Sequence, residues 1–229
     1  GMNKVSIKHI VSILVLTLTV GCLPNKSKIT IDELRSEIIS QTELIDGNIA
    51  VAFRDPTSAD RIILINANEK FHAASTMKTP VMIEIYNQFE LGKFKLTDSI
   101  MVINEFKSIV DGSNYSMDIA IDGGEGLYGK IGQMSTIYDL MYDMITVSSN
   151  LATNILIQLV NAESVTATMR KLGADQIEVL RGVEDQKAYD LGLSNSTTAN
   201  DLMLIMQAIA EGRAGAKADC QQMIEILKD

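Results

Sequence analysis

A serine stands three residues before a lysine in the stretch AASTMKTPVMIEIYNQFELGKF, residues 73–94. On a helical turn, side chains at positions i and i+3 share a face, so Ser75 and Lys78 can meet. A serine hydroxyl becomes a good nucleophile when a base takes its proton, and a lysine serves as that base when burial lowers its pKa. The spacing therefore fits a nucleophile with its proton acceptor, and it also fits a capping serine followed by a solvated lysine.

A second polar pattern lies about seventy residues downstream, where Ser148, Ser149 and Asn150 stand at the joint between two expected helices. Together the two patterns resemble class A β-lactamases and their penicillin-binding relatives, whose motifs are S-x-x-K, S-D-N and K-T-G. Ser149 replaces the aspartate of the second motif. The third motif is absent, because the 229 residues contain no KTG, KSG or HTG.

The resemblance implies a serine acyl-transfer enzyme. Ser75 would attack the lactam carbonyl, and Lys78 would take part in proton transfer to and from it. Ser148 would relay a proton toward the leaving nitrogen, while Asn150 would hold the substrate amide and the lysine in place.

A glutamate on an Ω-shaped loop activates the deacylating water in class A enzymes. The stretch VLRGVEDQKAYDLG, residues 179–192, occupies the corresponding place, and Glu184 is the expected base. Asp185 is a competing candidate, and a purely structural acid is the third reading. Glu184 stands three residues after Arg181, whereas the family pattern brings its arginine closer.

The fold class implied is α+β and β-lactamase-like, with a helical lobe beside an antiparallel sheet. β-Branched runs at 48–55 and 61–68 predict a hairpin, and helices are expected at 30–44, 76–91, 135–147, 150–160, 162–173, 197–212 and 217–227. Residues 95–134 are expected to be irregular. Since two strands make a weak sheet, we expect the C-terminal strands to be missing, through a shortened reading frame, a fragment, or completion by another chain.

The N-terminus reads as an export signal. Residues 1–21 combine a basic start with a short apolar core, and a lone Cys22 follows a small residue, as in bacterial lipoproteins. We expect a signal peptide at 1–21, a lipidated Cys22 with a tether at 22–29, and a serine hydrolase domain at 30–229, anchored to the periplasmic envelope. An ordinary secretory signal is the alternative. Cys220 would then be a buried thiol on a helix.

The composition and the spacing of residues argue against several other kinds of function. The net charge of −9 argues against nucleic acid as a partner. No ligand cluster has zinc-like spacing and no glycine-rich loop opens a helix, so neither a metal nor a cofactor is expected. A Ser-His-Asp triad would have to use His72, and nothing in the sequence aims that ring at Ser75.

Three functions therefore stand in order. The first is hydrolysis of the β-lactam amide through an acyl-enzyme at Ser75. The second is a penicillin-binding D,D-peptidase-like acyl-enzyme acting on peptidoglycan-like substrates. The third is a non-catalytic envelope lipoprotein that keeps the fold.

Overall fold

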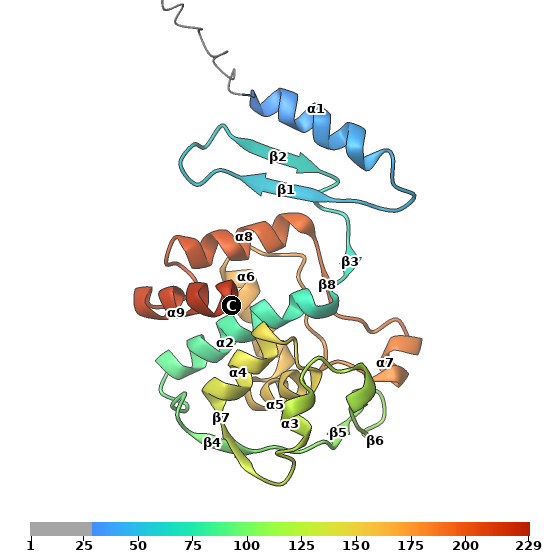
Figure 1. Cartoon of the computed structure of the whole chain (residues 1–229), viewed down its shortest axis with the longest axis vertical. Coiled ribbons are helices and arrows are strands. Elements are labelled where there is room, and N and C mark those ends of the chain that lie inside the picture. The colour runs from blue at the N-terminus through green and yellow to red at the C-terminus, as the bar shows by residue number, and fades with distance from the viewer. Residues whose placement is uncertain (1–28) are drawn as a thin grey trace, which may run out of the picture.

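The computed structural model describes residues 29–229 as a helical lobe with a hairpin and one helix at its end (Figure 1). The helices are α1 (Ile31–Thr42), α2 (Lys78–Glu90), α3 (Glu125–Tyr128), α4 (Ile137–Thr146), α5 (Asn150–Val160), α6 (Ala162–Lys171), α7 (Gln186–Asp190), α8 (Ala199–Ala210) and α9 (Lys217–Lys228). Two short 3₁₀ turns are η1 (Ala74–Met77) and η2 (Ile119–Ile121).

The strands are short and pair in twos. They are β1 (Val51–Arg54), β2 (Ile62–Ile65), β3 (Phe71–His72), β4 (Ser99–Met101), β5 (Phe106–Lys107), β6 (Asn114–Tyr115), β7 (Met134–Thr136) and β8 (Ser196–Thr197). The antiparallel pairs are β1 with β2, β3 with β8, β4 with β7, and β5 with β6. The predicted hairpin and the α+β class are confirmed.

The hairpin and α1 lie at one end of the long axis, and α8 faces them from the lobe (Figure 1). Helix α1 begins with a capping box: the Thr30 hydroxyl accepts from the Glu33 N–H, and the Glu33 carboxylate accepts from the Thr30 N–H. No residue of α1 is fully buried. Helix α1 therefore packs on β2 but contributes no fully buried side chain to a hydrophobic core.

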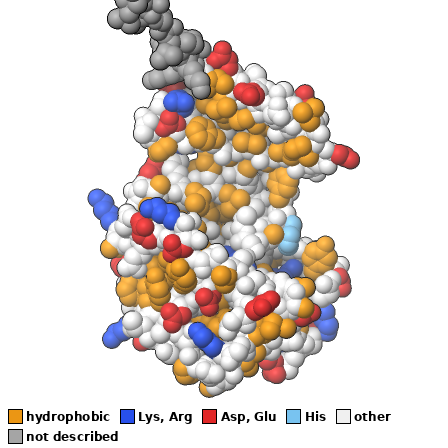
Figure 2. Space-filling model, in the orientation of Figure 1, with side chains coloured by type: hydrophobic (Ala, Val, Ile, Leu, Met, Phe, Trp, Pro, Cys, Tyr) orange, Lys and Arg blue, Asp and Glu red, His pale blue; other side chains and the backbone are white. Residues whose placement is uncertain are grey.

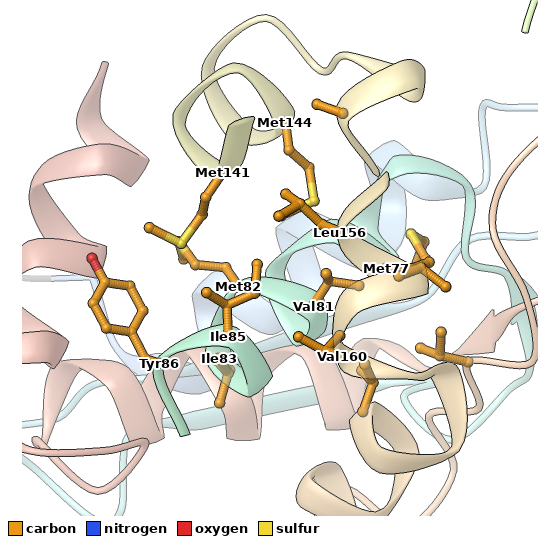
Figure 3. Close-up of a cluster of buried hydrophobic side chains, with 14 of the residues drawn as sticks. Met77, Val81, Met82, Ile83, Ile85, Tyr86, Met141, Met144, Leu156 and Val160 are labelled. Atoms are coloured by element: carbon orange, nitrogen blue, oxygen red, sulfur yellow. The ribbon is translucent and has the colours of Figure 1, made fainter. Parts of the chain in front are cut away.

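Helix α2 is the centre of the lobe. Helix α2 contacts α4, α5, α6 and α9. Because neighbours surround it, apolar side chains are buried on every face of the helix. Val81, Met82, Ile85 and Tyr86 have no exposed surface. Figure 3 shows side chains of α2, α4 and α5 pointing into this common core. The core holds the start of α2, and with it Lys78, in a fixed place.

The predicted start of this helix needs a correction. We expected it near Thr76, whereas α2 begins at Lys78 and the preceding turn is the 3₁₀ segment η1. Pro80 is tolerated because its missing N–H falls in the first turn, where N–H groups have no helical partner. Ser75 therefore lies in a separate turn, and Lys78 is the first residue of the helix that follows it.

The segment 95–134 is less irregular than expected. It contains β4, β5, β6, η2, α3 and the start of β7. Strands of two or three residues are too short to show alternation, so the sequence gives no periodic signal for them. Cys220 is buried on α9, as predicted. Among residues 29–229, no helix combines the length and apolarity that crossing a membrane requires.

Candidate active site

Ser75 lies in η1, where the chain turns from β3 into α2. A distant part of the chain fixes this turn, because the Ala73 N–H donates to the Asn195 carbonyl at 2.8 Å. Ala74 adopts a φ of 46°, a left-handed conformation that alanine rarely takes. This sharp turn leaves Ser75 exposed at the surface while Lys78 points inward.

Lys78 is only 2% exposed, and its ammonium group has three acceptors. Nζ donates to the Ser148 carbonyl at 2.5 Å, to the Ser148 Oγ at 2.9 Å and to the Asn150 Oδ1 at 2.9 Å. An ammonium group has three donors, so these bonds satisfy it completely. Lys78 therefore ties α2 to the loop between α4 and α5.

Ser148 stands between the serine and the lysine of the first motif. Its Oγ lies 3.0 Å from the Ser75 Oγ and accepts from Lys78. The structure contains no direct hydrogen bond between Ser75 and Lys78 among its described contacts. The sequence predicted a direct pair, and the observed arrangement is a chain of three groups with Ser148 in the middle.

The pKa of Lys78 is lowered to about 8. Burial is the main cause, since a charged amine is unfavourable away from water. The carboxylates of Asp122 and Glu184 act against it and raise the pKa. Lys78 is therefore neutral in part at pH 7 and mostly neutral above pH 8, and the neutral amine is the form that a general base requires.

The backbone at Ser148 explains how this serine reaches both partners. Its φ is 56°, so the chain reverses sharply after α4. Ser149 is fully buried, and its Oγ accepts from the Ala152 N–H at 3.2 Å to cap α5. A side chain at Gly124 would lie 2.4 Å from the Ser149 Cβ. Ser149 is therefore a packed cap, and Ser148 and Asn150 on either side of it face the site.

Asp122 supports this loop and was not found from the sequence. Its carboxylate accepts from the N–H groups of Gly124 at 3.0 Å, Asn150 at 2.8 Å and Leu151 at 2.9 Å, and from the Tyr128 hydroxyl at 2.9 Å. Burial alone would raise the pKa of Asp122, but these hydrogen bonds outweigh it and hold the pKa below its ordinary value. Asp122 lies in the segment 95–134, for which the sequence predicted only irregular structure.

Glu184 and Asp185 point in different directions. Glu184 Oε1 accepts from the Asn150 Nδ2 at 2.8 Å, and its Oε2 accepts from the Asp118 N–H at 3.3 Å. Glu184 therefore joins the same network as Lys78 through the side-chain amide of Asn150.

Asp185 is 1% exposed and holds the loop together instead. Its carboxylate accepts from the Ser108 Oγ at 2.8 Å, the Ile109 N–H at 2.9 Å and the Ala188 N–H at 3.2 Å. It caps α7, and its described hydrogen bonds reach none of Ser75, Lys78, Ser148 and Asn150. Of the two acids that the sequence left open, Glu184 is the one beside Asn150.

Asn154 fixes the loop that carries Glu184, and it was also missed. Its Oδ1 accepts from the Val183 N–H at 2.7 Å, while its Nδ2 donates to the Val183 carbonyl at 3.0 Å. A Cβ at Gly182 would lie 2.3 Å from the Asn154 Oδ1, so only glycine fits there. A second asparagine four residues after Asn150, on the same helical face, was the available signal.

Comparison with known proteins decides the family. A family model described as "Beta-lactamase enzyme family" matches residues 31–229. The chain belongs to the beta-lactamase enzyme family. The resemblance seen in the two motifs is confirmed, and the match covers every described element from α1 to α9.

Solved structures of this family share the fold. A beta-lactamase from Sphaerobacter thermophilus DSM 20745 is 26% identical with a TM-score of 0.67, covering 84% of this chain and 67% of that chain. One from Xanthomonas campestris pv. campestris is 17% identical with a TM-score of 0.71, over 87% and 70%. The protein PBP-A is 18% identical with a TM-score of 0.67, over 84% and 67%. The comparison with curated proteins found no significant match.

The remaining candidate residues of this beta-lactamase family member are His72, any metal-binding side chains and Cys22. His72 lies on β3 with its ring edge against Tyr189, 6.4 Å between centroids, and makes no hydrogen bond to Ser75 among the described contacts. Residues 29–229 contain no group of three or more metal-binding side chains. Cys22 and the signal segment lie outside the described residues.

Proposed function

We propose that this chain hydrolyses the amide of β-lactams through an acyl-enzyme at Ser75. The observation that carries the proposal is the unbroken hydrogen-bonded series from Ser75 through Ser148, Lys78 and Asn150 to Glu184. It links an exposed hydroxyl to a lysine of lowered pKa and, at the other end, to a carboxylate.

Acylation begins when the Ser75 Oγ attacks the lactam carbonyl. Its proton passes to Ser148, whose own proton passes to neutral Lys78 as the hydrogen bond between them reverses. The C–N bond then breaks, and Lys78 returns a proton through Ser148 to the leaving nitrogen. The products of this step are an ester on Ser75 and a free amine, and no proton is gained or lost.

Deacylation needs a water molecule and a base. Glu184 takes a proton from the water, whose oxygen attacks the ester carbonyl. The ester C–O bond then breaks and the Ser75 oxygen receives the proton that Glu184 took, so no proton is gained or lost. Asn150 holds the Glu184 carboxylate and the Lys78 ammonium at the same time, so it positions both catalytic groups. The Asn150 amide has further hydrogen-bonding positions, and we propose that they bind the amide of a substrate.

The test is the intact mass of the purified chain during incubation with a penicillin. We expect a mass gain equal to the whole drug on the parent, absent in Ser75→Ala, that decays as the ester hydrolyses. Glu184→Gln should form the same adduct and keep it. A stable adduct on the parent would instead favour the penicillin-binding peptidase function.

A folded parent that forms no adduct would contradict the proposed function and favour a non-catalytic envelope protein. Circular dichroism of the parent and Ser75→Ala supplies the control for folding. Because Ser75 is exposed, the alanine variant removes the nucleophile without opening the core.

We also propose that the chain is exported and anchored to the bacterial envelope through a lipid on Cys22. The support is the sequence of residues 1–22 alone. Growth with radioactive palmitate should label the parent and leave Cys22→Ala unlabelled. Equal labelling of both chains, or of neither, would contradict the anchor.

A further inference from the structure

A small pocket lies between the nucleophile turn η1 and the loop that carries Glu184, and we name it the acid-loop pocket. Its volume is about 150 Å³, and its lining includes His72, Ala74, Arg181, Glu184 and Tyr189. Strand β3, which carries His72, crosses the narrow part of the molecule between the hairpin end and the lobe, and Figure 2 shows the surface hollowed there. Tyr189 is 57% exposed, so the pocket is open to solvent.

Arg181 is the charged residue of this pocket that has unused hydrogen-bond donors. Its side chain is buried, and a guanidinium group has five N–H donors. Nε donates to the Leu193 carbonyl at 2.8 Å and Nη1 donates to the Gly182 carbonyl at 2.9 Å. Three of the five donors therefore have no partner among residues 29–229, and no carboxylate of these residues forms an ion pair with Arg181.

The unused donors of Arg181 remain accessible. Within residues 29–229, the fully enclosed polar side-chain atoms that lack a partner belong to Ser196 and Asp219, so the Nη2 of Arg181 keeps some exposed surface. Burying a charged group without a partner of opposite charge is unfavourable. An anion that reaches Nη2 would therefore gain strong hydrogen bonds and also stabilise the guanidinium.

The two acids that line the pocket direct their oxygens toward donors outside it. Glu184 and Asp185 accept from the groups described above, which belong to Ser108, Ile109, Asp118, Asn150 and Ala188. None of these five residues lines the pocket. Burial lowers the pKa of Arg181, and the nearby charge of Asp185 acts against this change. Arg181 stays charged, because a guanidinium does not lose its proton in proteins.

The guanidinium is also held in place. The Asn195 Oδ1 accepts from the N–H groups of Leu180 at 2.8 Å and Arg181 at 3.2 Å, and the Asn195 Nδ2 donates to the Arg181 carbonyl at 2.9 Å. These bonds fix the backbone of Arg181, while the Leu193 and Gly182 carbonyls fix its side chain. A guanidinium that is already fixed loses little conformational freedom when it binds a planar carboxylate.

We propose that the acid-loop pocket binds a carboxylate group. Its oxygens accept from the unused N–H donors of Arg181, and the rings of His72 and Tyr189, 6.4 Å apart at the surface, border the rest of the ligand. The carboxylate has two possible sources, a free small acid or the side chain of a substrate at Ser75, since Ala74 connects the pocket to the nucleophile turn. The first source goes beyond the proposed function, and the second rests on it.

The first arm of the test uses a free acid. The probes are phenylacetate and phenylacetamide, which share a ring and differ in charge, and each is added to the purified chain. We expect saturable chemical-shift changes at the Arg181 and Asn195 amides and none in α1. The acid should bind at least about tenfold more tightly than the amide, because only the acid forms charged hydrogen bonds with the guanidinium.

The second arm uses Ser75→Ala with benzylpenicillin and carbenicillin, whose side chains differ by one carboxylate. If the substrate is the source, calorimetry should show carbenicillin binding at least about tenfold more tightly. Phenylacetate binding without a preference for carbenicillin would assign the pocket to a free acid. Since Ser75→Ala has no nucleophile, this arm is independent of acylation. A parent that binds phenylacetate but forms no adduct with penicillin would contradict only the proposed function.

Two variants locate the ligand. Tyr189→Glu adds a negative charge at an exposed position of the opening, and it should weaken binding of phenylacetate by about tenfold or more. Tyr138→Glu is the matched control, because Tyr138 is also exposed, at 38%, but lies on α4 outside the pocket. Arg181→Gln should abolish the preference for the acid over the amide, and circular dichroism checks that this variant folds.

Two results would overturn the proposal. One is a folded parent that binds the acid no better than the amide, together with no preference for carbenicillin in Ser75→Ala. The other is binding of phenylacetate that Tyr189→Glu and Tyr138→Glu change equally, because the acid would then lie outside the acid-loop pocket.

Discussion

The support that Asp122 gives to the active-site loop can be tested by removing it. Asp122→Ala deletes the acceptor of three backbone N–H groups and of the Tyr128 hydroxyl, at a site where Asp122 is 5% exposed. Hydrogen bonds to a charged acceptor are worth about 1.5–3 kcal/mol each, and a buried donor left alone costs about 1–3 kcal/mol. Asn150 is only half-buried, so water replaces part of the loss.

We therefore expect the free energy of unfolding to fall by about 3–5 kcal/mol in Asp122→Ala. Asp122→Asn keeps the shape and one acceptor oxygen, so its loss should be about half as large. The assay is urea unfolding followed by circular dichroism, with Asp175→Ala as the control, since Asp175 is exposed and makes no side-chain hydrogen bond among the described contacts. A loss below about 1 kcal/mol for Asp122→Ala would refute the reasoning.

The same variant makes a prediction about pH. The folded pKa of Asp122 lies below its ordinary value, so its stabilisation is present at neutral pH and is lost as the pH falls through that lowered value. The difference between the parent and Asp122→Ala should accordingly shrink in acid. A difference that stays constant down to about pH 2 would mean that the carboxylate charge is not what the loop needs.

Three further predictions follow from the described contacts. The rate of adduct formation at Ser75 should increase with pH, because the pKa of Lys78 is about 8. The neutral fraction of the amine then rises from about a tenth at pH 7 to about nine tenths at pH 9. A rate, followed by intact mass, that does not change with pH would contradict Lys78 as the base. Asp219→Asn should raise the melting temperature near pH 8 and not near pH 4, because burial and the nearby Glu90 carboxylate raise the pKa of Asp219 to about 6. The stability of the protonated form is lost as the pH rises through that value, and equal shifts at both pH values would argue against this linkage. Gly182→Ala should slow deacylation more than acylation, since the new Cβ would collide with the Asn154 side chain that holds the Glu184 loop. Single-turnover kinetics separate the two steps, and equal slowing of both would indicate general unfolding instead.

The sequence was sufficient to place the main site residues in two local pairs. Ser75 and Lys78 fall on one turn, and Ser148 and Asn150 flank a single buried residue, so local spacing already places each pair on one side. Capping at Thr30 was equally predictable, because a Thr-x-x-Glu pattern satisfies helix N–H groups locally. These features depend on contacts within a few residues, which is the range that sequence patterns report.

The order of the hydrogen-bonded groups was not predictable. Ser148 stands between Ser75 and Lys78 only because its φ is positive, and a serine gives no sign of that conformation. Asp122 acts on α5 from 28 residues upstream, with no periodic pattern connecting them. Glu184 and Asp185 are adjacent in sequence, and their different roles follow from the loop's tertiary contacts.

Among residues 29–229, five non-glycine residues have a positive φ, and three of them, Ala74, Ser148 and Glu184, lie in the candidate site. Each costs about 1–2 kcal/mol relative to a glycine, which takes this conformation freely. Glycine at position 148 or 184 would release this strain, but it would also remove the hydroxyl that accepts from the buried Lys78 or the carboxylate that accepts from Asn150. Backbone strain and the polar side chains of the candidate site therefore occupy the same positions, so a substitution that relieves the strain removes the side chain.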